Sequence, residues 1–67
     1  MSIWFIGGGA MAEAMINGIL DSKVLPPDKI GVSELVEDRR SYLKERYGVE
    51  VMDGYQGLSA VKTVILA

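Results

Sequence analysis

The sequence predicts an α/β domain whose elements follow the order β-α-β-α-β-α-β around a parallel sheet. Continuous apolar runs at 3–6 and 63–67 are typical of strands that are covered on both faces. Segments with helical spacing separate the strand candidates, and the connections are short, which favours parallel strands joined by right-handed crossovers. Because the last strand reaches the end of the chain, we expect the sheet to be incomplete at its C-terminal side.

The first strand is expected at 3–6, and three glycines follow it. Helical spacing begins at Ala10, and the residues expected on the inner face are Met11, Ala14, Met15, Gly18 and Ile19. This helix should end near 21–23, because Pro26 and Pro27 cannot continue it. Glycine is unfavourable inside a helix, so we expect Gly18 to mark a close approach to a neighbouring backbone.

The remaining elements follow in order. We expect a strand at 29–33, a helix at 35–47 that Gly48 closes, a strand at 49–52, a turn at 53–54, one or two helical turns within 55–61, and a strand at 63–67. The second helix should bury a narrow seam of Val36, Leu43 and Tyr47. The aromatic side chains are expected in the core or half-buried: Trp4, Phe5, Tyr42, Tyr47 and Tyr55.

Composition limits the classes of protein to consider. The chain has 67 residues, of which 49% are hydrophobic, with neither cysteine nor histidine. This is one small domain at most, and a structural zinc site is not expected. We expect more chain or a partner to cover part of the apolar surface.

The net charge of −2 gives no electrostatic reason to expect nucleic acid or an anionic membrane as a partner. The first apolar run is too short for a signal peptide or a membrane span, so we expect a cytoplasmic protein.

The glycine motif Gly7-x-Gly9-x-x-Ala12 joins the first strand to the first helix. Gly7 would allow a sharp turn, Gly9 would let a pyrophosphate approach the backbone, and Ala12 would let helix and strand pack closely. No Ser, Thr, Asp or Asn caps this helix, so its first N–H groups are available to an anion. This context favours a Rossmann-like dinucleotide site over the alternative, a glycine-rich turn that serves packing alone.

The second strand ends at Ser33 and Glu34, and Glu34 lies 22 residues beyond Ala12 (34 − 12). An acid about 20 residues past the glycine motif binds the adenosine ribose in this fold, and a carboxylate there favours NAD over NADP. The alternative is a solvated acid at the start of the second helix. Arg39 and Arg40 could reach a 2′-phosphate, but we interpret them as part of a solvated helix face.

No nucleophile–base pair, carboxylate dyad or metal cluster is visible, so we assign neither catalytic nor metal-binding residues. Glu13, in the first turn of the first helix, is interpreted as complementing the helix dipole. The sequence therefore indicates a cofactor cradle.

The segment 5–14, with Gly18, resembles the N-terminus of pyrroline-5-carboxylate reductases, and the similarity continues through 29–33, 47–49 and 64–67. The resemblance implies that residues 1–67 are the N-terminal part of an NAD(P)-binding Rossmann domain. A following helical domain would supply the substrate pocket and a homo-oligomer interface, and NADPH or NADH would reduce 1-pyrroline-5-carboxylate, an imine, to proline.

Carried onto this chain, the resemblance assigns the pyrophosphate to the turn Ile6, Gly7, Gly8, Gly9, Ala10 and Met11. It places Ser33 and Glu34 at the adenosine ribose and Ala67 at the start of the loop on the nicotinamide side. NADPH is the usual cofactor of the family, whereas Glu34 argues for NADH.

Two alternatives stay open. The parent protein could be another imine or β-hydroxyacid reductase, or a non-catalytic NAD(H)-sensing module. In each case the 67-residue piece alone is expected to be inactive, because it holds half of a nucleotide site and no substrate pocket.

Overall fold

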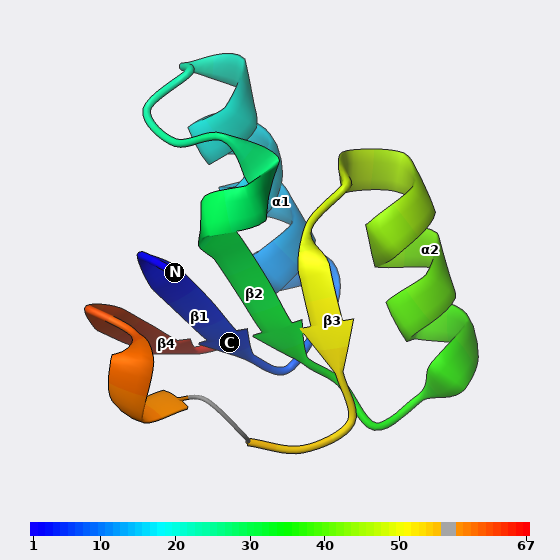
Figure 1. Cartoon of the computed structure of the whole chain (residues 1–67). Helices are drawn as coiled ribbons and strands as arrows, with labels where there is room; N and C mark the ends of the chain where they lie inside the picture. The colour runs from blue at the N-terminus through cyan, green and yellow to red at the C-terminus, as the bar shows by residue number, and fades with distance from the viewer. Residues whose placement is uncertain (56–57) are drawn as a thin grey trace.

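The computed structural model, described here for residues 1–55 and 58–67, is a four-stranded parallel sheet with two helices on one face (Figure 1). The strands are β1 (Ile3–Ile6), β2 (Ile30–Ser33), β3 (Glu50–Met52) and β4 (Thr63–Leu66). The helices are α1 (Ala10–Asp21) and α2 (Glu37–Tyr47), and short 3-10 turns cover Pro27–Lys29 and Leu58–Ala60. The predicted α/β class and parallel sheet are confirmed.

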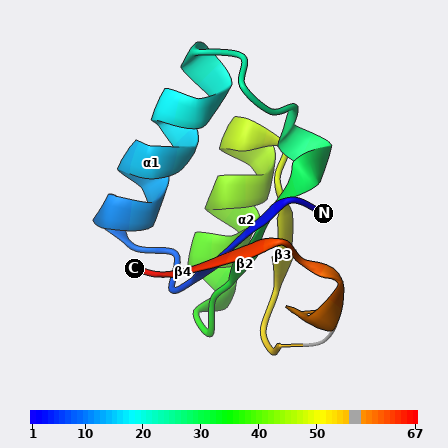
Figure 2. The ribbon, with the colours of Figure 1, turned by 90° about the vertical axis from the view of Figure 1, so that its left-hand side faces the viewer.

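The strand order is β3-β2-β1-β4, so the first strand of the chain lies inside the sheet. Ile3 pairs with Ile30 on one side and with Thr63 on the other. Figure 2 shows α1 and α2 on the same side of the strands, with the 58–60 turn on the opposite side. Because α1 follows β1 and α2 follows β2, both helices start at the edge where these parallel strands end.

The core lies between the sheet and the two helices. Its buried members are Phe5, Ala12, Ile16, Ile30, Val32, Leu43 and Val49. Trp4 is buried on the other face of the sheet, where its ring covers Gly31: a Cβ on Gly31 would lie 2.2 Å from the Trp4 ring.

The predicted inner face of α1 is wrong. Ala12 and Ile16 are the buried residues, whereas Met11 is 65% exposed and Met15 is 39% exposed. Ala14 and Gly18 are exposed as well, and Ile19 alone of the expected set packs against the core. Most residues of this helix are apolar, so more than one face has helical spacing, and the spacing alone does not determine which one meets the sheet.

The close approach expected at Gly18 is also absent from the described residues, since nothing lies within 4 Å of its ideal Cβ position.

The second helix begins two residues later than expected. Leu35 and Val36 precede α2 and are exposed, so Val36 is not part of the buried seam, while Leu43 is buried and Tyr47 packs against the core. Gly48 ends α2 in the left-handed conformation at φ +73°, as predicted.

Other boundaries differ by a residue or two. Lys29 belongs to the 3-10 turn, β3 begins at Glu50, and β4 ends at Leu66. Tyr55 is 59% exposed, so the expectation that it lies in the core or half-buried is wrong, whereas Tyr42 is 40% exposed and its ring packs edge-on against Tyr47. Of the expected helical turns in 55–61, the structure has Leu58–Ala60, and residues 56–57 lie outside the described residues.

Across the described residues, no helix combines the length and the apolar character that a membrane crossing requires.

Candidate dinucleotide-binding site

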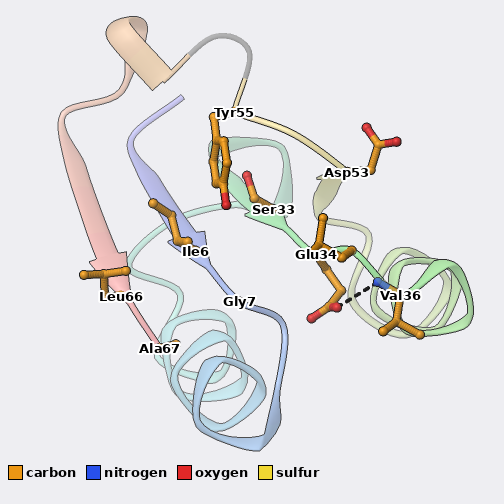
Figure 3. Close-up of a pocket in the computed structure, with 10 residues that line it drawn as sticks. Ile6, Gly7, Ser33, Glu34, Val36, Asp53, Tyr55, Leu66 and Ala67 are labelled. Carbon is orange, nitrogen blue, oxygen red and sulfur yellow. Dashed lines mark hydrogen bonds between the residues drawn. The ribbon is translucent and has the colours of Figure 1, made fainter.

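A groove of about 430 Å³ opens at the carboxyl ends of β1, β2 and β4 (Figure 3). Five of the residues singled out in the sequence line it: Ile6, Gly7, Ser33, Glu34 and Ala67. The sequence did not point to the other lining residues, which are Leu35, Val36, Asp53, Tyr55 and Leu66. Ligands of parallel α/β sheets bind at the carboxyl ends of the strands. This rule could have predicted that the residues following β3 also line the groove.

The turn from β1 into α1 requires glycine at its first position. Gly7 has a φ of +100°, and a Cβ there would lie 2.9 Å from the carbonyl oxygen of Ala67. The Gly7 N–H donates to the Ser33 carbonyl at 2.8 Å, which ties the turn to the end of β2. Gly9 differs: its φ is −80°, and apart from its chain neighbours no heavy atom of the described residues lies within 4 Å of its ideal Cβ position. Space for a ligand therefore remains beside Gly9.

The N-terminus of α1 has no side-chain cap, as the sequence predicted. The first intrahelical bond runs from the Glu13 N–H to the Gly9 carbonyl at 3.0 Å. The N–H groups of Ala10, Met11 and Ala12 therefore have no partner inside the helix. Together with the helix dipole, they make this end of α1 attractive to an anion. Met11 extends from the same turn and is largely exposed.

Glu34 follows β2 directly and turns its carboxylate back onto the backbone. Oε1 accepts the Gly8 N–H at 2.8 Å, and Oε2 accepts the Val36 N–H at 2.9 Å, which Figure 3 marks. The bonds from Val36 and Gly8 lower the pKa of Glu34, so the carboxylate is charged at neutral pH. Each carboxylate oxygen can accept more than one hydrogen bond, so acceptor positions remain for a ligand hydroxyl.

The hydroxyl proton of Ser33 is already used in a hydrogen bond within the protein. The side chain is 5% exposed, its Oγ accepts the indole N–H of Trp4 at 2.7 Å, and it donates to the Gly54 carbonyl at 2.6 Å. A serine hydroxyl has one proton to donate, so Ser33 can offer a ligand only an acceptor. Its main role in this structure is to join β1, β2 and the segment after β3.

Arg39 and Arg40 are not the solvated pair that the sequence suggested. Arg40 donates from one nitrogen to the carbonyls of Glu34 at 2.7 Å and Leu35 at 3.0 Å. Arg39 donates from Nε to the Gly8 carbonyl and from a terminal nitrogen to Glu13 Oε1 at 2.7 Å. Neither side chain lines the groove.

Glu13, Arg39, Tyr42 and Tyr47 form a cluster between the helices, called here the Glu13 cluster. The hydroxyls of Tyr42 and Tyr47 donate to Glu13 Oε2 at 2.6 and 2.5 Å, and the Arg39 guanidinium lies 5.0 Å from the Tyr42 ring centroid. The bonds from Tyr42, Tyr47 and Arg39 lower the pKa of Glu13 to about 2. The bond to Glu13 raises the pKa of Tyr47 to about 12.

The Glu13 cluster was not found from the sequence, although its position follows from the topology. Glu13 lies in the first turn of α1 and Arg39 near the start of α2. The two helices start at the same edge of the sheet on the same face, so oppositely charged residues in their first turns come together.

The family of this chain is identified by its similarity to known proteins. The model of the family described as NADP oxidoreductase coenzyme F420-dependent matches residues 2–67. The chain belongs to this family. Its members are NAD(P)-dependent oxidoreductases, and the resemblance to pyrroline-5-carboxylate reductases is confirmed by the relatives that follow.

Two relatives are bacterial proteins of that name. The chain is 50% identical over 48 residues to pyrroline-5-carboxylate reductase 2 of Bacillus subtilis (strain 168), a match that covers 70% of this chain and 17% of that protein. It is 36% identical over 66 residues to pyrroline-5-carboxylate reductase of Synechocystis sp. (strain ATCC 27184 / PCC 6803 / Kazusa), which covers 98% of this chain and 25% of that protein.

A solved structure, a pyrroline-5-carboxylate reductase from Coxiella burnetii, superposes with a TM-score of 0.90 at 33% identity. The match covers 98% of this chain and 24% of that one, so the chain spans a quarter or less of these relatives.

The described residues contain no group of three or more Asp and Glu side chains arranged to hold a metal ion.

Proposed function

We propose that residues 1–67 are the N-terminal part of the NAD(P)-binding Rossmann domain of a pyrroline-5-carboxylate reductase. The proposal is carried by one observation: a groove at the carboxyl edge of the sheet lies beside an uncapped helix N-terminus in a chain of this family. A glycine-rich turn that served packing alone would not require an open space at Gly9.

In this proposal the turn from Ile6 to Met11 wraps the pyrophosphate. Its anionic oxygens would accept N–H groups at the start of α1 in the space beside Gly9. Glu34 would accept a hydroxyl of the adenosine ribose, and Ser33 would shape that end of the groove. Ala67 would begin the segment on the nicotinamide side.

We propose NADH as the preferred cofactor. The groove is lined by Glu34 and Asp53, and a 2′-phosphate would bring a like charge close to the Glu34 carboxylate. Arg39 and Arg40, the two cations nearest in sequence, are bonded to backbone carbonyls and to Glu13.

The reaction of the whole protein would be reduction of the C=N bond of 1-pyrroline-5-carboxylate. The dihydronicotinamide would give a hydride to the imine carbon, the nitrogen would gain a proton, and the products would be proline and oxidised cofactor. The remainder of the protein would supply the substrate pocket and the homo-oligomer interface. The 67-residue piece alone would bind cofactor incompletely and would not turn over.

The test is oxidation of NADH and of NADPH by the whole protein, each with and without pyrroline-5-carboxylate. Turnover that depends on the substrate and is faster with NADH would support the proposal. Tight cofactor binding without turnover would favour a different reductase substrate or an NAD(H)-sensing module.

A further inference from the structure

The backbone of Gly8 is held from two sides by residues that follow β2. Its N–H donates to Glu34 Oε1 at 2.8 Å, and its carbonyl accepts the Arg39 Nε–H. A Cβ on Gly8 would meet Leu43 at 2.8 Å, so this part of the turn is closely packed. Such packing leaves the peptide that follows Gly8 little freedom to rotate.

That peptide joins Gly8 to Gly9 and is trans, since the described chain contains no cis peptide bonds. In a planar trans peptide the C=O and the N–H point in opposite directions. Because Arg39 holds the Gly8 carbonyl, the Gly9 N–H must point away from Arg39 and α2. The direction of this donor is therefore set by a side chain outside the glycine motif.

Arg39 is itself held in place. Glu13 accepts its terminal nitrogen at 2.7 Å, and the Tyr42 ring lies 5.0 Å from the guanidinium carbon. Glu13 is fixed in turn by the hydroxyls of Tyr42 and Tyr47. All four members of the Glu13 cluster have partners, and the bond from Arg39 to the Gly8 carbonyl links the side chains of the cluster to the glycine turn.

We propose that Arg39 is a positioning residue for the dinucleotide pyrophosphate. It holds the Gly8 carbonyl so that the Gly9 N–H is presented to the anion, and Glu13 keeps Arg39 in that orientation. This inference rests on the proposed function, because it needs a pyrophosphate at the N-terminus of α1. It differs from direct recognition, in which the charge of Arg39 would attract the phosphates.

The test measures binding of NADH, ADP-ribose and adenosine to the whole protein by titration calorimetry. The variants are Arg39→Met, Glu13→Met and the two combined. Lys44→Met is the control, since Lys44 is an exposed residue of α2 and its loss makes the same change in charge as Arg39→Met. Adenosine has no pyrophosphate, so its affinity reports on the adenosine end of the site alone. Partial unfolding would lower the apparent affinity for adenosine and for NADH by the same factor, so the ratio of the two affinities does not depend on the fraction of folded protein.

We expect Arg39→Met and Glu13→Met each to weaken NADH and ADP-ribose about tenfold, which corresponds to ~1.4 kcal/mol, about one hydrogen bond. Adenosine affinity should change less than about twofold, and the double variant should be no weaker than either single one, because both changes release the same peptide. Lys44→Met should bind all three ligands as the original protein does.

Glu13→Met separates positioning from direct attraction by the sign of its effect. If the charge of Arg39 acted directly on the phosphates, removal of the Glu13 carboxylate would tighten NADH binding, and that result would overturn the inference. Equal losses for adenosine and NADH would overturn it too, because they would indicate general loosening of the domain. Failure of the original protein to bind any dinucleotide would overturn both this inference and the proposed function, whereas unchanged variants would overturn this inference alone.

Discussion

Replacement of Gly9 by valine should separate cofactor binding from folding. The backbone of Gly9 has φ −80° and ψ −165°, a conformation open to every L-residue, and nothing lies within 4 Å of its ideal Cβ. The new side chain would therefore enter the space proposed for the pyrophosphate without contacting the described parts of the protein.

The expected cost in folding is small. Valine is a poorer N-cap residue than glycine by up to ~1 kcal/mol, while a side chain reduces the entropy of the unfolded chain by an equivalent of ~0.4–1 kcal/mol. These effects offset each other, so the free energy of unfolding should change by less than about 1 kcal/mol. The affinity for NADH should fall by a larger amount. Loss of two N–H bonds to a charged phosphate, at ~1.5–3 kcal/mol each, weakens affinity more than about 100-fold.

The assay combines NADH titration with thermal unfolding, and Gly18→Ala is the matched control. Gly18 is also open at its Cβ position but lies nine residues farther along the chain, inside α1, so alanine there should stabilise the protein by ~1 kcal/mol and leave NADH affinity unchanged. Full NADH affinity in Gly9→Val, with unfolding unchanged, would refute the assignment of the pyrophosphate to this turn.

Three other perturbations address separate parts of the structure. Glu34→Ser should raise the NADPH-to-NADH ratio of kcat/KM at least about fivefold, since loss of a like charge ~4 Å from a phosphate is worth ~1 kcal/mol even in water. Gly31→Ala should destabilise the protein by ~1–3 kcal/mol, read as a lower midpoint in urea, because the methyl group would lie 2.2 Å from the Trp4 ring. The pKa of Glu13 falls from 4.5 to about 2 on folding, so its contribution to stability is complete above pH 4.5 and is lost as the pH falls toward 2. The Glu13→Met variant should therefore lose less stability than the original protein over this range in acid unfolding.

Each of these expectations has a contrary result. An unchanged cofactor ratio in Glu34→Ser would place this carboxylate away from the ribose. Normal stability of Gly31→Ala would mean that the Trp4 ring can move aside at little cost. Parallel acid-unfolding curves for Glu13→Met and the original protein would show that another carboxylate, such as Glu34, carries the pH dependence.

The sequence predicted the strands and the glycine turn well because these features depend on local chemistry. The run Ile3–Ile6 is apolar throughout, Gly7 needs a positive φ, and Gly48 closes α2. Each of these signals lies within a few residues of the feature that it specifies, so no knowledge of the tertiary contacts is needed.

The rotation of α1 could not be predicted in the same way. Its sequence offers Met11 and Met15 on one face and Ala12 and Ile16 on another, and both faces have helical spacing. In the structure α1 is rotated so that Ala12 and Ile16 join the buried cluster that contains Phe5. The apolar pattern of the helix alone does not specify that rotation.

The contacts of Arg39 were missed for a related reason. Within α2 its neighbours suggest an ordinary solvated charge, and its partners Gly8 and Glu13 are 31 and 26 residues away. Side chains that bridge two helices can be anticipated from the topology, but their hydrogen-bond partners depend on the relative rotation of those helices.

The strand order also has a consequence for how the protein is made. β1 leaves the ribosome before both of its neighbours: it pairs with β2 on one side and on the other with β4, whose register joins Ile3 to Thr63. One edge of this apolar strand must therefore stay unpaired until Thr63–Leu66 have been synthesised. Unpaired apolar strands of growing chains are sites of aggregation, and long-range parallel pairing is slow. The strand that leads into the proposed cofactor site thus exposes one edge until β4 emerges.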